Sequence, residues 1–241
     1  MLTGDAHFTP EQAAKDYATL KVELDDIFGK NEKKILTLSG NWEYYFMRQF
    51  SRLNTDWYGM AWHWYPLGAG SSNDVIPNIN NPDFTQTIVK DRLEEIQFWR
   101  NRDVPSAELW MGETGGAFNS GQNTTTNTFM SHRWYLDQLG MFAKNGHSAY
   151  CRQTLIGGNY GLLQRDGDVV HVNPDFYGAL LFHHIMGDAV KDVAIIDNDD
   201  ATRNVHIYSH TTGSTGYTSI LAINFYREQE VFIKVRNKVP F

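Results

Sequence analysis

The stretch Leu109-Trp-Met-Gly-Glu-Thr-Gly-Gly-Ala-Phe-Asn-Ser-Gly121 decides the fold of this chain. It opens with an apolar run that ends at Gly112, which predicts a short buried strand followed by a glycine-rich turn. Barrel and other α/β folds place their chemistry at the carboxyl ends of such strands. Glu113 stands at that end and is therefore the first candidate for a catalytic carboxylate. A solvated loop glutamate has the same local pattern, and the residue types alone favour that alternative.

A second stretch repeats this design in Tyr150-Cys-Arg-Gln-Thr-Leu-Ile-Gly-Gly-Asn-Tyr-Gly-Leu-Leu163. A strand predicted over Ser148 to Gln153 leads into a turn that contains Gly158 and Tyr160. Backbone N–H groups in a glycine turn can bind an anion, and Tyr160 adds a hydroxyl donor. By residue type alone, a plain Gly-Gly turn with a packed tyrosine is an equally good interpretation.

Strand-like runs and helical patterns alternate along the first 190 residues. The strand-like runs are Ile35 to Leu38, Trp57 to Tyr65, Glu108 to Glu113 and Ser148 to Gln153. The helical patterns cover 10–28, with Thr9 as the expected N-cap, and 81–100, 128–143 and 175–186. A parallel barrel repeats the strand-and-helix unit eight times. The sequence therefore predicts an α/β fold that contains half of a (β/α)8 barrel.

Alternation along residues 57–65 separates two sets of side chains. His63 and Tyr65 share one face with Ala61, while Trp62 and Trp64 point to the opposite face. The tryptophans are expected in the core. A histidine in an aromatic strand packs about as often as it serves a site, so the residues alone leave the role of His63 open.

The pattern changes beyond residue 190 to β-type alternation. Strands are predicted from Val205 to Tyr208, from Tyr217 to Tyr226 and from Glu230 to Val235. These are too few to close a β-sandwich. The predicted organisation is thus a partial barrel domain over 1–190 and a β-type region over 191–241.

The overall charge limits the classes of partner. The chain has 21 Lys plus Arg against 28 Asp plus Glu, a formal net charge of −7, and its longest basic run is Lys33-Lys34. Nucleic acids and extended sulfated polymers are held by clustered cations. The charge therefore argues against both and favours a smaller or less charged ligand.

Other sequence signals are weak. The single cysteine, Cys151, cannot form an internal disulfide and is expected to be a buried small hydrophobe. His183 and His184 are adjacent on a helix and lack a suitably spaced third ligand, so no metal or other cofactor is predicted. No signal peptide or transmembrane segment is visible. The sequon that begins at Asn123 is compatible with a secretory route.

Several of these segments resemble the heparanase-like proteins of glycoside hydrolase family 79, above all the plant-type branch. Members read closely to Trp-x-Gly-Glu-x-Gly-Gly-Ala-Tyr-Asn-Ser-Gly, against Trp110 to Gly121 here. The similarity continues through Trp134 to Met141, Cys151-Arg-Gln, Gly157 to Leu163 and Asn173 to Leu181. It covers about residues 57 to 190, and the ordered series of segments makes it specific.

The resemblance implies a retaining glycosidase that acts on a β-glucuronide or a related glucuronic-acid-containing glycan. Glu113 matches the nucleophile of the family. The matching substrate contacts are His63, Tyr65, Asn119, Ser120, Gln153, Gly158 and Tyr160. A β-sandwich follows the barrel in this family, so the resemblance also implies that 191–241 is the start of a β-sandwich domain. The family further implies an extracellular, lysosomal or vacuolar, or membrane-associated location.

Retaining glycosidases need a second carboxyl group as acid/base. In this family that glutamate follows an asparagine at the end of the fourth barrel strand, and Leu2 to Phe8 resembles the loop that comes after it. The one Asn-Glu pair present, at Asn31, precedes a strand and is read as a surface turn. The expectation is that the acid/base and an amino-terminal half lie outside this chain. The alternative is a non-catalytic remnant or a carbohydrate-binding fragment.

Overall fold

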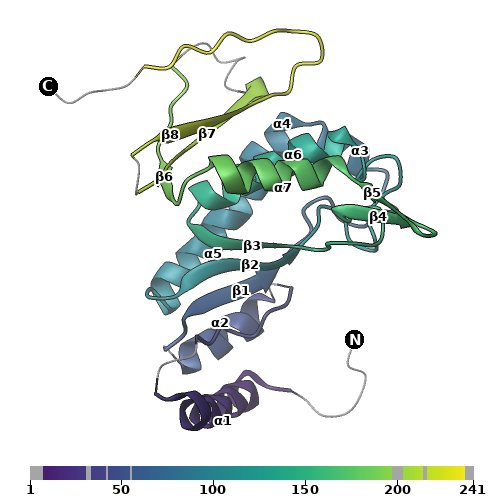
Figure 1. Ribbon diagram of the computed structural model, residues 1–241. Helices are drawn as coiled ribbons and strands as arrows, with labels where there is room; N and C mark the ends of the chain where they lie inside the picture. Colours follow the sequence, from purple (N-terminus) through teal and green to yellow (C-terminus); the bar gives the residue numbers. More distant parts are fainter. Residues whose placement is uncertain are drawn as a thin grey trace, which may run out of the picture.

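A computed structural model describes residues 8–30, 34–41, 43–54, 56–196, 203–213 and 216–236. Its centre is a parallel sheet in the order β1 (Gly59–His63), β2 (Glu108–Thr114) and β3 (His147–Arg152). The parallel strands are connected through helices, as parallel pairing requires. Figure 1 shows α1 and α2 beyond β1 and the pair α6 and α7 on the side of β3. Of the segment Leu2 to Phe8, residues 2–7 lie outside the described residues, and so do Asn31 and Glu32.

The helices follow the apolar periodicity of the sequence. The elements are α1 (Pro10–Phe28), α2 (Tyr44–Leu53), α3 (Val75–Ile79), α4 (Pro82–Phe84), the π-helical turn η1 (Thr85–Val89), α5 (Lys90–Asp103), α6 (Phe129–Lys144) and α7 (Pro174–Ile185). The four predicted helices are confirmed, with 81–100 divided into α4, η1 and α5. Thr9 caps α1 by accepting a hydrogen bond from the Gln12 amide. The prediction missed α2 and α3.

The core lies between one face of the parallel sheet and the helices. Trp62, Leu109 and Met111 are fully buried there against Leu93 of α5 and Phe142 of α6. Trp64 stacks on Trp62 with ring centroids 6.0 Å apart. The expectation that both tryptophans leave the face of His63 for the core is therefore confirmed.

Two predicted strands differ from the structure. Residues 35–38 form no strand; Leu36 makes an isolated parallel bridge to Gly59, and Asn41 makes another to His63. The described residues 230–235 are also without strand structure. A hairpin that the sequence analysis missed joins β4 (Leu163–Asp166) to β5 (Val169–Val172) through a turn in which Gly167 has φ +57°.

A second, antiparallel sheet has the order β6 (Ala189–Lys191), β7 (Val205–Thr211) and β8 (Thr218–Asn224). The predicted strands at 205–208 and 217–226 are confirmed as β7 and β8. The sheet packs on α6, where the ring of Tyr208 lies so close to Gly140 that a Cβ there would come within 2.3 Å of it. His206 and Tyr208 both bond the buried Asp137 of α6.

Candidate active site

A bulge in β2 determines where Glu113 points. Trp62 of β1 pairs with Met111, whereas the next residue, His63, pairs with Glu113, so Gly112 is the extra residue. Strict alternation would place Glu113 on the face of Met111, in the core. The bulge re-aims the carboxylate to the other face, as bulges beside functional sites commonly do.

Glu113 meets two side chains from the end of β1. The hydroxyl of Tyr65 donates to Glu113 Oε1 at 2.8 Å, and His63 Nδ1 lies 3.7 Å from Oε2. Glu113 keeps 38% of its side chain exposed and His63 keeps 23%. Burial, followed by the hydrogen bond to Glu113, raises the pKa of Tyr65. The phenol therefore stays protonated at neutral pH and remains a donor to the carboxylate.

Ser39 is a site residue that the sequence analysis missed. Its Oγ lies 2.7 Å from His63 Nε2. In the tautomer in which Ser39 donates to Nε2, the ring proton sits on Nδ1 and faces Glu113. Gly112 makes room for this contact, because a Cβ at that position would lie 2.4 Å from Ser39 Oγ. No sequence motif marks Ser39; its segment lies beside the site because Leu36 and Asn41 bridge to β1 and His63 N donates to Gly40 O at 2.7 Å.

The loops after β1 and β2 form one continuous surface at the carboxyl end of the sheet. Leu67 N donates to Gly116 O at 3.0 Å, and Phe118 exchanges two 2.8 Å backbone bonds with Gly68 and Gly70. A Cβ on Gly70 would approach the carbonyl oxygen of Gly121 to 2.0 Å. Glycine is therefore required where the two loops touch.

The loop after β3 joins the same surface. Asn159 N donates to Ser120 O at 2.6 Å, and a Cβ on Gly158 would lie 2.9 Å from the Ser120 Cβ. The ring of Tyr160 lies against Gly115, where a Cβ would come within 2.7 Å of it. The loops of the second and third strands thus meet beside the end of β2.

The structure brings most of the predicted site residues into one region. His63 and Tyr65 contact Glu113 directly. Asn119 and Ser120 are exposed and have φ of 57° and 69°, which form a left-handed turn next to Gly158. Gln153 adjoins the end of β2, where its backbone N donates to Thr114 O at 2.7 Å. The roles of these residues toward a substrate stay predictions.

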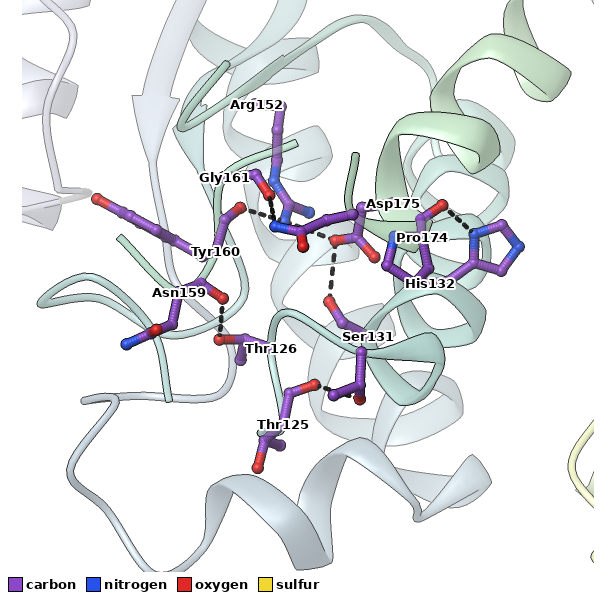
Figure 2. A network of polar contacts seen from close by, with 12 residues as sticks. Thr125, Thr126, Ser131, His132, Arg152, Asn159, Tyr160, Gly161, Pro174 and Asp175 are labelled. Atoms are coloured by element: carbon purple, nitrogen blue, oxygen red, sulfur yellow. Dashed lines mark hydrogen bonds and ion pairs between the residues drawn. The ribbon is translucent and has the colours of Figure 1, made fainter. Parts of the chain in front are cut away.

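A buried ion pair behind the third loop was also missed. Arg152 Nη2 donates to Asp175 Oδ2 at 2.6 Å and to the carbonyl oxygen of Tyr160 at 2.7 Å (Figure 2). The side chains of Arg152 and Asp175 are 5% and 1% exposed. Burial raises the pKa of Asp175, while Arg152 and then Ser131 act against that shift. The one sequence signal was a charged residue within an otherwise apolar strand.

Other expectations concern cofactors, Cys151 and the membrane. Within the described ranges, no group of three or more His, Cys, Asp or Glu side chains could hold a metal ion. Cys151 is exposed, so the expectation of a buried hydrophobe is wrong; its neighbour Tyr150 is the residue that packs against α6. In the same described part of the chain, no helix combines the length and apolar character of a membrane span.

Relatives of known sequence match this chain over much of its length. It is 39% identical to the baicalin-beta-D-glucuronidase of Scutellaria baicalensis over 173 residues, which are 72% of this chain and 32% of that protein. It is 32% identical to heparanase-like protein 2 of Arabidopsis thaliana over 238 residues, 97% of this chain and 43% of the relative. The chain therefore spans about a third to under half of the length of these relatives.

Solved structures share the fold at low sequence identity. An α-L-arabinofuranosidase of glycoside hydrolase family 51 from Thermotoga petrophila superposes with a TM-score of 0.69 and 11% identity, over 92% of this chain and 49% of that one. A 4-O-α-L-rhamnosyl-β-D-glucuronidase from Fusarium oxysporum gives 0.56 and 16%, over 88% and 46%. The mixed α/β architecture is consistent with part of the barrel of such glycosidases.

The match to a described family agrees with the relatives and the geometry. Residues 3–140, more than half of the chain and including Glu113, match the family described as "Glycosyl hydrolase family 79, N-terminal domain". The chain belongs to glycosyl hydrolase family 79.

Proposed function

We propose that this chain carries the nucleophile and the uronic-acid-binding loops of a retaining β-glucuronide hydrolase. The observation that carries the proposal is the placement of Glu113 at the carboxyl end of the parallel sheet, bonded by Tyr65 and faced by His63. A carboxylate held by one donor yet partly open to solvent can attack a bound sugar. Hydrolases of family 79 and relatives named for glucuronidase and heparanase activities support the reaction class.

In the proposed reaction, Glu113 attacks the anomeric carbon of the sugar. The new bond joins that carbon to a Glu113 oxygen as the bond to the leaving oxygen breaks, and water later hydrolyses the glycosyl ester. Tyr65 holds the carboxylate in one geometry through its 2.8 Å hydrogen bond. The Gly158 amide and the Tyr160 hydroxyl bind the carboxylate of the sugar, with Asn119 and Ser120 on the neighbouring turn and Gln153 at the end of β3.

The acid/base carboxyl group has to stand about 5 Å from the nucleophile in such enzymes. We propose that a part of the protein outside these 241 residues supplies it; this chain covers 32% and 43% of the length of the two relatives, which is compatible with such a part. The second half of a (β/α)8 barrel, followed by the first strands of a β-sandwich, is the matching proposal for the fold. The family also favours an extracellular, vacuolar or membrane-associated location, with which the exposed Asn123 of the sequon agrees.

The proposed substrate is a small or weakly charged glucuronide. The net charge is −7, and Arg152, the buried cation behind the third loop, is paired with Asp175. A sulfated polymer calls for clustered cations. The relative with 39% identity is named for a glucuronidase of baicalin, which supports the same choice.

A mechanism-based reagent tests the proposal on the 241-residue chain. A 2-fluoro-glucuronide with an activated leaving group needs no acid, so mass spectrometry should find the sugar attached to Glu113. Glu113→Gln should prevent the labelling. Glu108→Gln is the matched control, because Glu108 lies at the other end of β2 and bonds Tyr58 and Trp110; it should leave labelling intact.

The chain covers only 32% and 31% of the length of two relatives, and this favours a second candidate, a non-catalytic remnant or carbohydrate-binding fragment. Absence of labelling in a chain shown to be folded by circular dichroism and cooperative unfolding would favour that candidate and reject the nucleophile.

A further inference from the structure

The turn that carries Gly158 and Tyr160 is fixed through its carbonyl groups. Thr126 Oγ1 donates to Asn159 O at 2.7 Å, Arg152 Nη2 to Tyr160 O at 2.7 Å, and Asn173 Nδ2 to Gly161 O at 2.9 Å. Three consecutive carbonyls are thus held by side chains from three separate segments. In Figure 2 the ring of Tyr160 extends away from this network.

The Arg152–Asp175 pair is the buried centre of that network. Arg152 extends from the end of β3, and Asp175 stands in the first turn of α7. Ser131 of α6 donates to the same Asp175 oxygen at 2.9 Å, and the guanidinium lies 4.6 Å from the ring centroid of Tyr135. A buried charge is tolerated when a partner and hydrogen bonds compensate it. Since Asp175 neutralises it, Arg152 acts on the turn through position, and presents little net charge to a ligand.

We propose that Arg152 and Asp175 are positioning residues that set the recognition of the carboxylate of the sugar by the turn. Neither side chain has to touch the ligand. Arg152 holds the Tyr160 carbonyl, and through the backbone this contact fixes the Tyr160 side chain, which extends away from the network, and the nearby Gly158 amide. The inference rests on the proposed function, since it names the part of that site that separates a glucuronide from the neutral glucoside.

A second buried pair in the same molecule supplies a matched control. Asp137 of α6 accepts from Tyr208 at 2.7 Å and lies 2.7 Å from His206 Nδ1, and the side chains of Asp137 and His206 are 0% and 1% exposed. Asp137 connects α6 to the antiparallel sheet, and its described hydrogen bonds include none with residues 154–162. Asp175→Asn and Asp137→Asn therefore make the same chemical change at similar burial, one at the turn and one away from it.

The test compares two labelling reagents on the 241-residue chain. They differ only at C6, one being a 2-fluoro-glucuronide and the other the corresponding 2-fluoro-glucoside. In Asp175→Asn, labelling of Glu113 by the glucuronide should slow by about tenfold or more, the loss of roughly one hydrogen bond to a charged group. Labelling by the glucoside should hardly change. Asp137→Asn should leave the ratio of the two rates at its wild-type value.

If Asp175→Asn slowed labelling by both reagents equally, or slowed neither, the ratio of the two labelling rates would keep its wild-type value. That result would overturn the proposal and leave the pair with a structural role. Amide hydrogen exchange over residues 157–161 provides a readout that needs no reaction. Exchange there should accelerate in Asp175→Asn alone; unchanged exchange contradicts the positioning role. If neither reagent labels the wild type, the proposed function fails, while exchange still decides the positioning. Should Asp175→Asn not fold, Ser131→Ala removes the hydroxyl that donates to the Asp175 carboxylate and can be tested in the same comparison.

Discussion

The two sheets of this molecule differ in how regularly their strands pair. In the antiparallel sheet, β7 and β8 pair residue for residue from Val205 with Asn224 to Thr211 with Thr218. In the parallel sheet, β1 and β2 shift register at His63, and β2 and β3 shift between Leu109 and Trp110 and again between Met111 and Thr114. Two of these shifts fall at the strand ends that carry the candidate site.

This difference separates residues that pack from residues that are presented to a ligand. An uninterrupted ladder keeps every side chain on the face that alternation assigns to it. A bulge interrupts the alternation and re-aims the side chains that follow it. Here it turns Glu113 from the core face toward Tyr65. Substitutions at the bulged carboxyl end of the parallel sheet should therefore alter labelling of Glu113, and substitutions in the antiparallel sheet should alter stability alone.

The largest expected effect is an acid sensitivity that belongs to the parallel sheet. Burial lowers the pKa of His147, the first residue of β3, from 6.5 to about 3, and Trp62 Nε1 donates to its Nε2 at 3.1 Å. In the unfolded chain His147 therefore binds a proton below pH 6.5, whereas in the folded chain it stays neutral down to about pH 3. This histidine thus removes stability as the pH falls through that window, by up to about 1.4 kcal/mol per pH unit.

Urea unfolding at a series of pH values checks this prediction. In His147→Gln the free energy of unfolding should be lower at neutral pH but should fall less steeply between pH 6.5 and 4. Ile223→Val in β8 is the comparison in the antiparallel sheet; it removes no titratable group and should keep the wild-type slope. An unaltered slope in His147→Gln would contradict the assignment.

The next effect concerns the bulge itself. A Cβ on Gly112 would lie 2.4 Å from Ser39 Oγ, so Gly112→Ala should push Ser39 away from His63. Overpacking of this kind costs about 1–3 kcal/mol of stability, and labelling of Glu113 should slow as well. Gly213→Ala is the control, since the nearest atom to its Cβ would be 3.7 Å away on Asp188. A stable Gly112→Ala protein with wild-type labelling would show that the bulge does not need this glycine.

Much of the fold was predictable because local signals and packing agreed. The Thr9 cap predicted the start of α1, the apolar stripe predicted the buried face of α6, and alternation predicted a buried Trp62. The structure has all three. The prediction failed where contacts with other segments decide the structure. Among residues 35–38, which are all described, Leu36 alone bridges to β1, so no strand forms, and Cys151 is exposed although its strand is apolar.

The candidate site was predictable in its residues and much less in its geometry. Glu113, His63 and Tyr65 were singled out by strand ends and resemblance, yet simple alternation would have turned Glu113 into the core. The bulge that corrects this is visible only in the pairing with β1. Ser39, Arg152 and Asp175 act through contacts between segments far apart in the chain, at separations of 24 and 23 residues, and no local pattern reports such contacts.

A smaller effect compares two equivalent hydrogen bonds at opposite ends of β1 and β2. Tyr65 donates to Glu113 at 2.8 Å, and Tyr58 donates to Glu108 at 2.7 Å. Tyr65→Phe should slow labelling of Glu113 by about tenfold, the loss of one hydrogen bond to a charged group. Tyr58→Phe should leave labelling unchanged. Equal rates in the two variants would mean that Tyr65 does not orient the nucleophile.

The smallest effect lies in the antiparallel sheet and should leave the chemistry untouched. The Tyr208 hydroxyl donates to Asp137 Oδ1 at 2.7 Å, and the same oxygen lies 2.7 Å from His206 Nδ1. Because that second contact remains, Tyr208→Phe should cost only about 1 kcal/mol of unfolding free energy. Thermal unfolding measures the loss, and labelling of Glu113 by the glucuronide and glucoside reagents should keep its wild-type rates. A change in either rate would mean that the regular sheet also influences the site, because α6 connects Asp137 to Ser131 and through it to the Asp175 carboxylate.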